Sequence, residues 1–271
     1  MEIFFFTILI SLFAWLILSP VVFVWWFFDP YAKNRFSKSH GKIAMVIYIG
    51  AFLSLMLIFS QGIEKRKVQI IRLPGIPSKL LKILPLDNPT HDVVYIGRIV
   101  QRKGLHVLLK ALSLVRKEMQ EIKATIAGPA DHNYLRKLVN LMHKLGLQCA
   151  IEIKEPVSES RKYEVIRQHK VFVLPSLRDY TPNIILEAQA LGVPVIASRV
   201  GAVPKMMIEG ETGLLVEPDN DDDLAEAIKK ILFNGRLRKR MSIRAKEFAE
   251  NFTLEKQIDS LESLYKLLLG D

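Results

Sequence analysis

Hydrophobic residues follow two different patterns that divide the chain into two parts. Residues 3–28 and 43–60 are apolar stretches without a single charged residue, whereas short apolar runs alternate with amphipathic stretches beyond residue 92. About 20 uncharged apolar residues are needed to cross the hydrocarbon core of a bilayer. We therefore predict a membrane anchor over residues 1–61, in which residues 3–28 form a transmembrane helix and residues 43–60 form a second membrane segment.

A cleaved signal peptide is the alternative for the first apolar run. The run is too long for a signal peptide, a second run follows it, and the start of the chain carries Glu2 instead of basic residues. The topology has two solutions. If both runs span the membrane, the basic loop 29–42 lies opposite the C-terminal domain, against the positive-inside bias. If only the first run spans, every basic flank stays on the cytoplasmic side.

Strand patterns alternate with helix patterns in the remainder of the chain. Continuous apolar strands separated by helices are typical of a parallel sheet that is buried by helices on both faces. We predict a single doubly wound, Rossmann-like α/β domain over residues 92–271, preceded by a proline-rich linker and domain entry at residues 62–91. The predicted strands are Asp92–Gly97, Ala124–Gly128, Cys149–Ile153, Val171–Leu174, Pro194–Ala197 and Leu214–Val216, and the predicted helices are Leu105–Glu118, Tyr134–Leu145, Ser158–His169, Asn183–Leu191, a short piece at Lys205–Ile208, a helix from Asp221 and Leu254–Leu269.

The positive charge of the chain is concentrated beside the apolar runs. The net charge is +10, and residues 29–85 contain ten Lys or Arg but only two acidic residues. A basic collar next to membrane segments indicates attraction to anionic lipid headgroups on the cytoplasmic side. Because the rest of the chain is close to neutral, nucleic-acid binding is disfavoured. The single cysteine, Cys149, excludes an internal disulfide and is expected to be a small buried residue of a strand.

Candidate chemistry lies after the predicted strands, because ligands of doubly wound sheets bind at the carboxyl ends of the strands. Arg98 and Lys103 follow the first strand in a loop bounded by Gly97 and Gly104. Glycines allow close approach of the backbone, and the two cations can hold a diphosphate by charge-assisted hydrogen bonds. A solvated basic loop is the alternative. Gly128 follows the second strand in a similar position.

The loop after the fourth strand carries a second set of polar groups. Thr181 and Pro182 have the pattern of an N-cap and a first helical residue, so the amides that follow are expected to face an anion at the helix start. Asp179 and Glu187 lie on either side of this turn. Their carboxylates can accept hydrogen bonds from the hydroxyls of a sugar or a ribose.

Taken together, these segments resemble the C-terminal, nucleotide-sugar-binding half of the group 1, or family 4, retaining GT-B glycosyltransferases. The resemblance covers roughly residues 62–269. It rests on the segments GRIVQRKGLHVLLKAL, ATIAGP, LPSLRDYTPNIILEAQALGVPVIAS, VGAVP and EGETGLLVEPDNDDDLAEAI.

The resemblance implies a role for each candidate residue. Arg98 and Lys103 would hold the donor diphosphate, Asp179 would face the donor sugar, and Glu187 would bind the ribose hydroxyls. The sequence departs from the family in Asp179, where Glu is usual, and in Lys205, where Glu is frequent. No metal or other cofactor is expected. The implied catalytic residues are Asp179 and Glu187, and the implied donor-binding residues are Gly97, Arg98, Lys103, Gly128, Thr181, Pro182, Asn183 and Glu187.

Two hypotheses of different class follow from the resemblance. The first is a membrane-bound, metal-independent, retaining glycosyltransferase of the hexosyltransferase type, which uses a nucleotide-sugar donor and a lipid-linked or membrane-proximal acceptor. The family's N-terminal acceptor domain is expected to be replaced by membrane segments in this sequence, so the acceptor half is expected to come from a separate acceptor-domain polypeptide or from the membrane hairpin itself. The second hypothesis is a non-catalytic nucleotide-sugar-binding or scaffolding subunit of a membrane glycosylation complex. The presence of both acids and both cations favours the enzyme.

Overall fold

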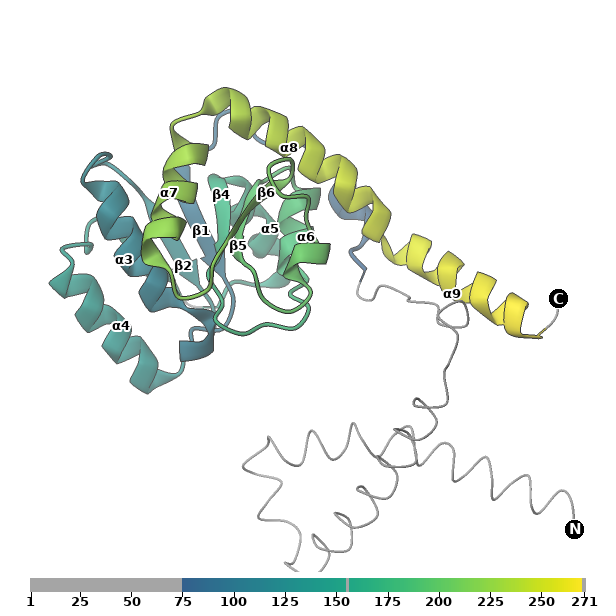
Figure 1. The fold of residues 1–271 in the computed structure, drawn as a ribbon, viewed down its shortest axis with the longest axis horizontal. Coiled ribbons are helices and arrows are strands. Elements are labelled where there is room, and N and C mark those ends of the chain that lie inside the picture. Colours follow the sequence, from purple (N-terminus) through teal and green to yellow (C-terminus); the bar gives the residue numbers. More distant parts are fainter. Residues whose placement is uncertain (1–74, 155, 270–271) are drawn as a thin grey trace, which may run out of the picture. The chain divides into compact units, whose positions relative to one another are not determined.

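A six-stranded parallel sheet forms the centre of the computed structural model, which describes residues 75–154 and 156–269 (Figure 1). The strand order is β3-β2-β1-β4-β5-β6, and each neighbouring pair is parallel. This arrangement confirms the predicted doubly wound α/β domain, and each predicted strand is present. The strands are β1 (His91–Ile96), β2 (Ala124–Ala127), β3 (Ile151–Lys154), β4 (His169–Leu174), β5 (Val195–Ser198) and β6 (Gly213–Val216).

The direction in which the sheet is built reverses between β1 and β4. The chain first moves outward from β1 through β2 to β3, and it then returns to the other side of β1 to form β4. Val93 of β1 is accordingly paired with Ala124 of β2 on one side and with Val171 of β4 on the other. In doubly wound sheets, ligands bind in a crevice at the carboxyl ends of the strands beside such a reversal.

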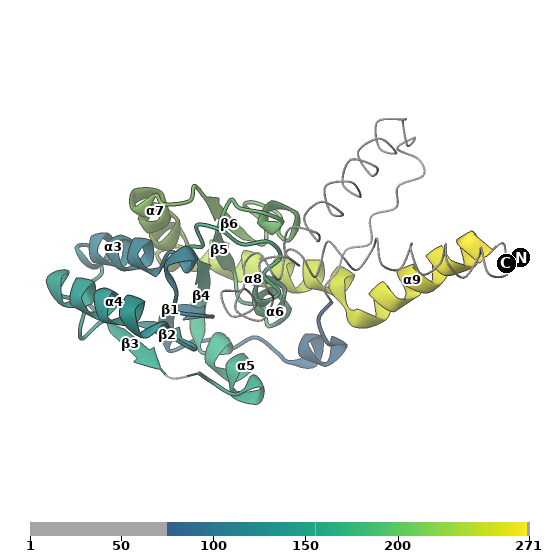
Figure 2. The same ribbon diagram turned by 90° about the horizontal axis from the view of Figure 1, so that it is seen from below.

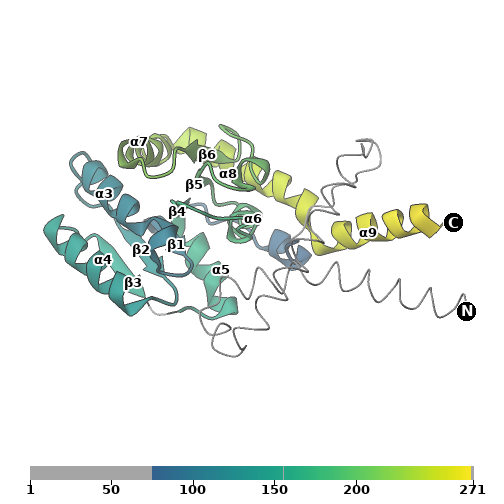
Figure 3. The same cartoon turned by 60° about the horizontal axis from the view of Figure 1, so that its bottom comes forward.

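Helices cover both faces of the sheet (Figures 2 and 3). One face carries α3 (Leu105–Arg116), α4 (His132–Lys144) and α7 (Asp221–Leu232), and the other carries α5 (Glu159–Arg167) and α6 (Ile184–Ala190). Strands β1, β2, β4 and β5 are almost entirely buried between these layers, as continuous apolar strands require, whereas the edge strand β3 is partly exposed. The last two α-helices are α8 (Gly235–Ala249), which packs against α6, and α9 (Leu254–Leu269).

Local sequence explains where several helices begin. Asp131 caps α4 by accepting a hydrogen bond from the Tyr134 amide at 2.8 Å, and Asn220 caps α7 by accepting one from the Asp223 amide at 3.0 Å. The acidic residues of the first turn of α7 lie at the positive end of the helix dipole. The predicted start of this helix at Asp221 is therefore confirmed.

Two local predictions were wrong. Cys149 is exposed and lies in a turn, because β3 begins only at Ile151. Helix α8 was not predicted from the sequence; its buried residues are Met241, Ala245 and Ala249. These three residues form a narrow stripe of mostly small side chains among charged ones, and such a stripe produces little hydrophobic periodicity.

The described end of the predicted linker packs on the domain. Ile76 is 1% exposed, its amide donates a hydrogen bond to the carbonyl of Phe252, and its carbonyl accepts one from the amide of Leu254. Leu80, in a short 3-10 helix (Ser78–Lys82), is completely buried. Helix α9 begins at Leu254, as predicted. Its residues Leu254, Ile258 and Tyr265 are among the large apolar side chains exposed in the described part of the chain.

The predicted membrane segments lie outside the described residues. The undescribed part, residues 1–74, includes both apolar runs and the first part of the predicted linker. Within residues 75–154 and 156–269, no helix has the length and apolarity needed to cross a bilayer. The membrane anchor therefore stays a prediction.

Candidate functional site at the ends of β1 and β4

The loops that follow β1 and β4 are in direct contact at the carboxyl edge of the sheet. The carbonyl of Arg102 accepts hydrogen bonds from the amides of Leu177 at 2.9 Å and Arg178 at 3.3 Å. Gly104 has a positive φ of 66°, and a Cβ at this position would collide with the carbonyl of Pro175. Glycine is therefore required where the two loops meet, and the predicted cationic loop lies against the predicted acidic loop.

Lys103 and Asp179 join the two loops through their side chains. The Lys103 ammonium contacts Oδ2 of Asp179, and the two side chains are 13% and 12% exposed. The same Asp179 oxygen accepts a hydrogen bond from the Ser176 hydroxyl at 3.2 Å, while Oδ1 accepts one from the Tyr180 amide at 3.1 Å. Two residues that were predicted to share a site are thus brought together, and the carboxylate is held by three donors.

Tyr95 of β1 is hydrogen-bonded to the backbone of the cationic loop. Its ring is completely buried in β1, and its hydroxyl donates a hydrogen bond to the carbonyl of Arg98 at 2.8 Å. Burial raises the pKa of Tyr95, the negative charge of Asp179 raises it further, and Arg102 and Arg98 oppose this rise. Residues of both loops therefore act electrostatically on one buried hydroxyl.

Gly97 and Gly128 allow the loops after β1 and β2 to cross closely. A Cβ on Gly128, which has a φ of 144°, would collide with the carbonyl of Gly97, and a Cβ on Gly97 would lie 2.8 Å from the Tyr95 hydroxyl. The loop after β1 is also fixed by hydrogen bonds of Ile99 with Pro129 and Asp131. Both predicted glycines are therefore needed for the backbone geometry that presents Arg98, whose side chain is exposed.

The predicted start of the helix after β4 was one to two residues too early. Helix α6 begins at Ile184 and is preceded by Asn183, which has helical φ and ψ angles and makes no side-chain cap. Thr181 and Pro182 remain in the loop, where Thr181 is exposed and Pro182 is buried. The Ile185 amide bonds to the Pro182 carbonyl as in a 3-10 turn, so the threonine does not act as the N-cap.

Glu187 lies in the first turn of α6 and forms an ion pair with α5. Its Oε2 is 2.8 Å from Nζ of Lys162, and the two side chains are 13% and 14% exposed. Oε2 is buried, and the Lys162 ammonium is the cation that neutralises it.

The predicted site residues thus fall into two groups in the described structure. Lys103 and Asp179 pair where the two loops meet, and Arg98 lies in the first of these loops, whereas the interactions found for the Glu187 carboxylate join it to α5. The sequence did not reveal Lys162, because an ion pair between two helices leaves no periodic signal. The phenol of Tyr95 in an otherwise aliphatic buried strand was a usable signal, since buried hydroxyls need a hydrogen-bond partner.

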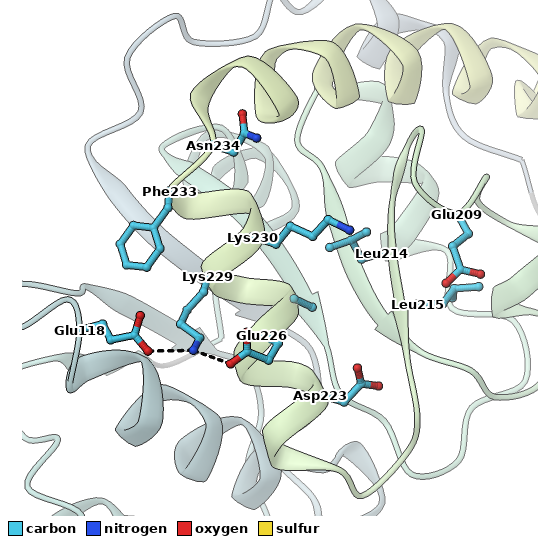
Figure 4. Close-up of a pocket in the computed structure, with 11 residues that line it drawn as sticks. Glu118, Glu209, Leu214, Leu215, Asp223, Glu226, Lys229, Lys230, Phe233 and Asn234 are labelled. Atoms are coloured by element: carbon cyan, nitrogen blue, oxygen red, sulfur yellow. Dashed lines mark hydrogen bonds and ion pairs between the residues drawn. The ribbon is translucent and has the colours of Figure 1, made fainter.

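A hollow of about 720 Å³ lies away from these loops, along α7 and the edge strand β6 (Figure 4). Lys229 points between Glu118, in the turn after α3, and Glu226 of α7 and pairs with both, so much of the charge that lines the hollow is neutralised internally. Residues predicted to bind the donor do not line it. In the described part of the chain, no group of three or more His, Cys, Asp or Glu side chains is arranged to hold a metal ion.

Comparison with known proteins identifies the family. The family model described as "Glycosyl transferases group 1" matches residues 78–248, which is more than half of the chain. The chain belongs to this family. The match includes β1 to β6 and both loops of the candidate site, and it confirms the coarse part of the resemblance drawn from the sequence.

The chain is similar in sequence to proteins that are about twice as long as the matched region. It is 30% identical over 224 residues to a D-inositol 3-phosphate glycosyltransferase of Corynebacterium diphtheriae, and the match covers 81% of this chain and 49% of the relative. The chain therefore spans about half the length of this curated relative.

Solved structures share the fold. The C-terminal domain of a group 1 glycosyltransferase (LpcC) from Francisella tularensis matches with a TM-score of 0.60 and 20% identity, over 66% of this chain and all of that domain. Anabaena Alr3699/HepE, solved in complex with UDP, matches with a TM-score of 0.66 and 18% identity, over 86% of this chain and 69% of that protein.

Proposed function

We propose that the chain binds a nucleotide sugar and forms the donor half of a retaining, metal-independent glycosyltransferase. The observation that carries the proposal is the contact between the loops after β1 and β4, which joins Lys103 to Asp179 at the point where the strand order reverses, in the same loop that carries Arg98. Ligands of doubly wound sheets bind at this point. A diphosphate with an attached sugar matches a site that combines cations with a carboxylate.

Each site residue has a role in this proposal. Arg98 and Lys103 bind the diphosphate and stabilise the charge that develops on it as the glycosidic bond breaks. Asp179 faces the donor sugar, and the backbone of Thr181, Pro182 and Asn183 lies near sugar and phosphate. Glu187 accepts hydrogen bonds from the ribose hydroxyls, because a carboxylate paired with one ammonium has further acceptor sites.

Nucleotide binding by the full-length chain tests the site. UDP, GDP and ADP are titrated into the wild type by calorimetry, and the nucleotide with the highest affinity is kept as the probe. The Arg98→Ala and Glu187→Ala variants should each weaken binding of the probe about tenfold or more, because each loses charge-assisted hydrogen bonds. Arg236→Ala, which removes an exposed arginine at the start of α8, is the matched control. Wild-type affinity in both site variants would show that the site lies elsewhere.

The acceptor and the location of the chain belong to the same proposal. We propose a lipid-linked or membrane-proximal acceptor, and a membrane anchor in residues 1–61 with the C-terminal domain on the cytoplasmic side. The support comes from the uncharged runs 3–28 and 43–60 and the basic residues beside them. Recovery of the full-length chain in the soluble fraction of lysed cells would contradict the anchor.

A non-catalytic subunit is the second candidate, because the chain spans about half the length of the curated relatives it matches. Transfer assays distinguish the two candidates. Sugar transfer or donor hydrolysis by the full-length chain, alone or with an added acceptor-domain polypeptide, supports the enzyme. Nucleotide binding without turnover under all of these conditions supports the subunit.

A further inference from the structure

Lys162 is a buried cation that the predicted site does not include. It lies on α5, and its ammonium contacts the carboxylates of two residues, Glu187 on α6 at 2.8 Å and Glu159 on its own helix at 2.9 Å. The two carboxylates differ strongly in environment. The Glu159 side chain is 75% exposed and also accepts a hydrogen bond from the Tyr163 hydroxyl at 2.8 Å, whereas the Glu187 side chain is 13% exposed.

The ion pair with Glu187 is the more consequential of the two contacts. Burial favours the neutral form of Lys162, but the carboxylates of Glu187 and Glu159 outweigh this effect, and the pKa of Lys162 is raised. The ammonium therefore stays charged beside a buried carboxylate. A carboxylate in such an environment is costly without a compensating charge, so the position of Glu187 depends on Lys162.

We infer that Lys162 is a positioning residue, which holds the Glu187 carboxylate in the orientation in which it can accept hydrogen bonds from the ribose hydroxyls of the donor nucleotide. This inference rests on the proposed function, because it presupposes that Glu187 contacts the ribose. Lys162 itself need not touch the ligand. Its ammonium contacts Oε2 of Glu187, and the carboxylate has further acceptor sites that can align with hydroxyl donors.

Discrimination between a ribonucleotide and a deoxyribonucleotide tests the inference in the full-length chain. The wild type should bind UDP about tenfold or more tightly than 2′-deoxy-UDP, since the latter lacks one of the hydrogen bonds to a charged group. If UDP is not the preferred nucleotide, the corresponding pair with the preferred base is used. Lys162→Met should reduce the preference to less than about threefold, and Lys162→Arg, which keeps the charge, should restore it. A change in packing alone would weaken both ligands equally.

Glu159→Gln is the matched control. It removes the exposed carboxylate that contacts the same ammonium, and it should leave the preference for the ribonucleotide unchanged. The double variant Lys162→Met/Glu187→Gln leaves no buried charge unpaired, so it provides a result even if Lys162→Met alone fails to fold. If Lys162 acts through Glu187, the double variant should bind both ligands as Glu187→Gln does.

The possible failures are distinguishable. If Glu187→Gln keeps the preference for the ribonucleotide, the assignment of Glu187 in the proposed function is wrong. If Glu187→Gln loses the preference but Lys162→Met keeps it, the site stands and the role of Lys162 is refuted. A further loss of affinity in the double variant, relative to Glu187→Gln, would also refute it, because Lys162 would then act independently of Glu187.

Discussion

Replacement of Asp179 by asparagine should strengthen nucleotide binding while it abolishes sugar transfer. In the ligand-free protein Lys103 is already paired with Asp179, and both side chains are largely buried. A diphosphate that binds Lys103 must therefore share the ammonium with a carboxylate. Asparagine has nearly the same shape and can keep the hydrogen bond from the Tyr180 amide, but it removes the competing negative charge.

The size of the effect follows from this geometry. If one ammonium bridges the carboxylate and a phosphate, the two negative charges lie about 6 Å apart. At an effective dielectric constant of about 20, they repel each other by about 2.8 kcal/mol. Half of this value, as an allowance for screening by water at the open edge of the sheet, corresponds to about a tenfold decrease in Kd. Transfer should fall because Asp179 is proposed to face the donor sugar.

Calorimetric titration of the full-length chain with its preferred nucleoside diphosphate measures the change in Kd, and a transfer or donor-hydrolysis assay measures turnover. Glu217→Gln is the matched control. Glu217 is an exposed acid that directly follows β6 and pairs with Arg199, which directly follows β5, and it is not part of the proposed site. Unchanged or weaker binding by Asp179→Asn would refute the reasoning, since Lys103 would then not be shared with the diphosphate.

Two further predictions concern the backbone near the site and the response to pH. Gly201→Ala should weaken nucleotide binding about tenfold, because the added Cβ would collide with the Asp179 carbonyl and lie 2.8 Å from the Tyr180 carbonyl. Gly146→Ala is the control. Gly146 also has a positive φ, but no atom lies within 4 Å of an added Cβ, so this variant should bind the nucleotide normally. His169 is buried, and burial lowers its pKa to about 4. Because the unfolded state binds the proton first as the pH falls, stability should decrease from pH 6.5 towards pH 4, by up to about 3 kcal/mol. Denaturant titrations at pH 7.5 and 4.5 should show a smaller loss for His169→Gln; an equal loss would contradict the assignment.

The strands were predictable because each one is a short apolar run that ends at a polar or glycine residue. Their order was not contained in these runs, because the pairing of β1 with β4 joins segments with two other strands between them. The resemblance to a known family implied that order. The narrow buried stripe of α8 gave no comparable signal, since two of its three buried residues are alanines.

The candidate site was predictable at the level of loops but not of contacts. The position of Arg98, Lys103 and Asp179 after apolar strands was sufficient to place them at one edge of the sheet. The pairing of Lys103 with Asp179 and the collision that makes Gly104 necessary depend on how the two loops fold against each other. The Thr181-Pro182 pattern was misleading, because the preference of proline for the first helical turn was overridden by the burial of Pro182 in the loop.

Both acids of the candidate site are paired with a lysine before any ligand binds. Asp179 is paired with Lys103 and Glu187 with Lys162, and the pairs are buried to a similar degree. The pairs should respond differently to a nucleotide sugar. The first lies in the crevice and must exchange its partners with the diphosphate, whereas the second joins two helices and can stay intact while Glu187 accepts hydroxyl donors. Affinity for the donor should therefore depend on the cost of opening the first pair, and selectivity for ribose on the integrity of the second.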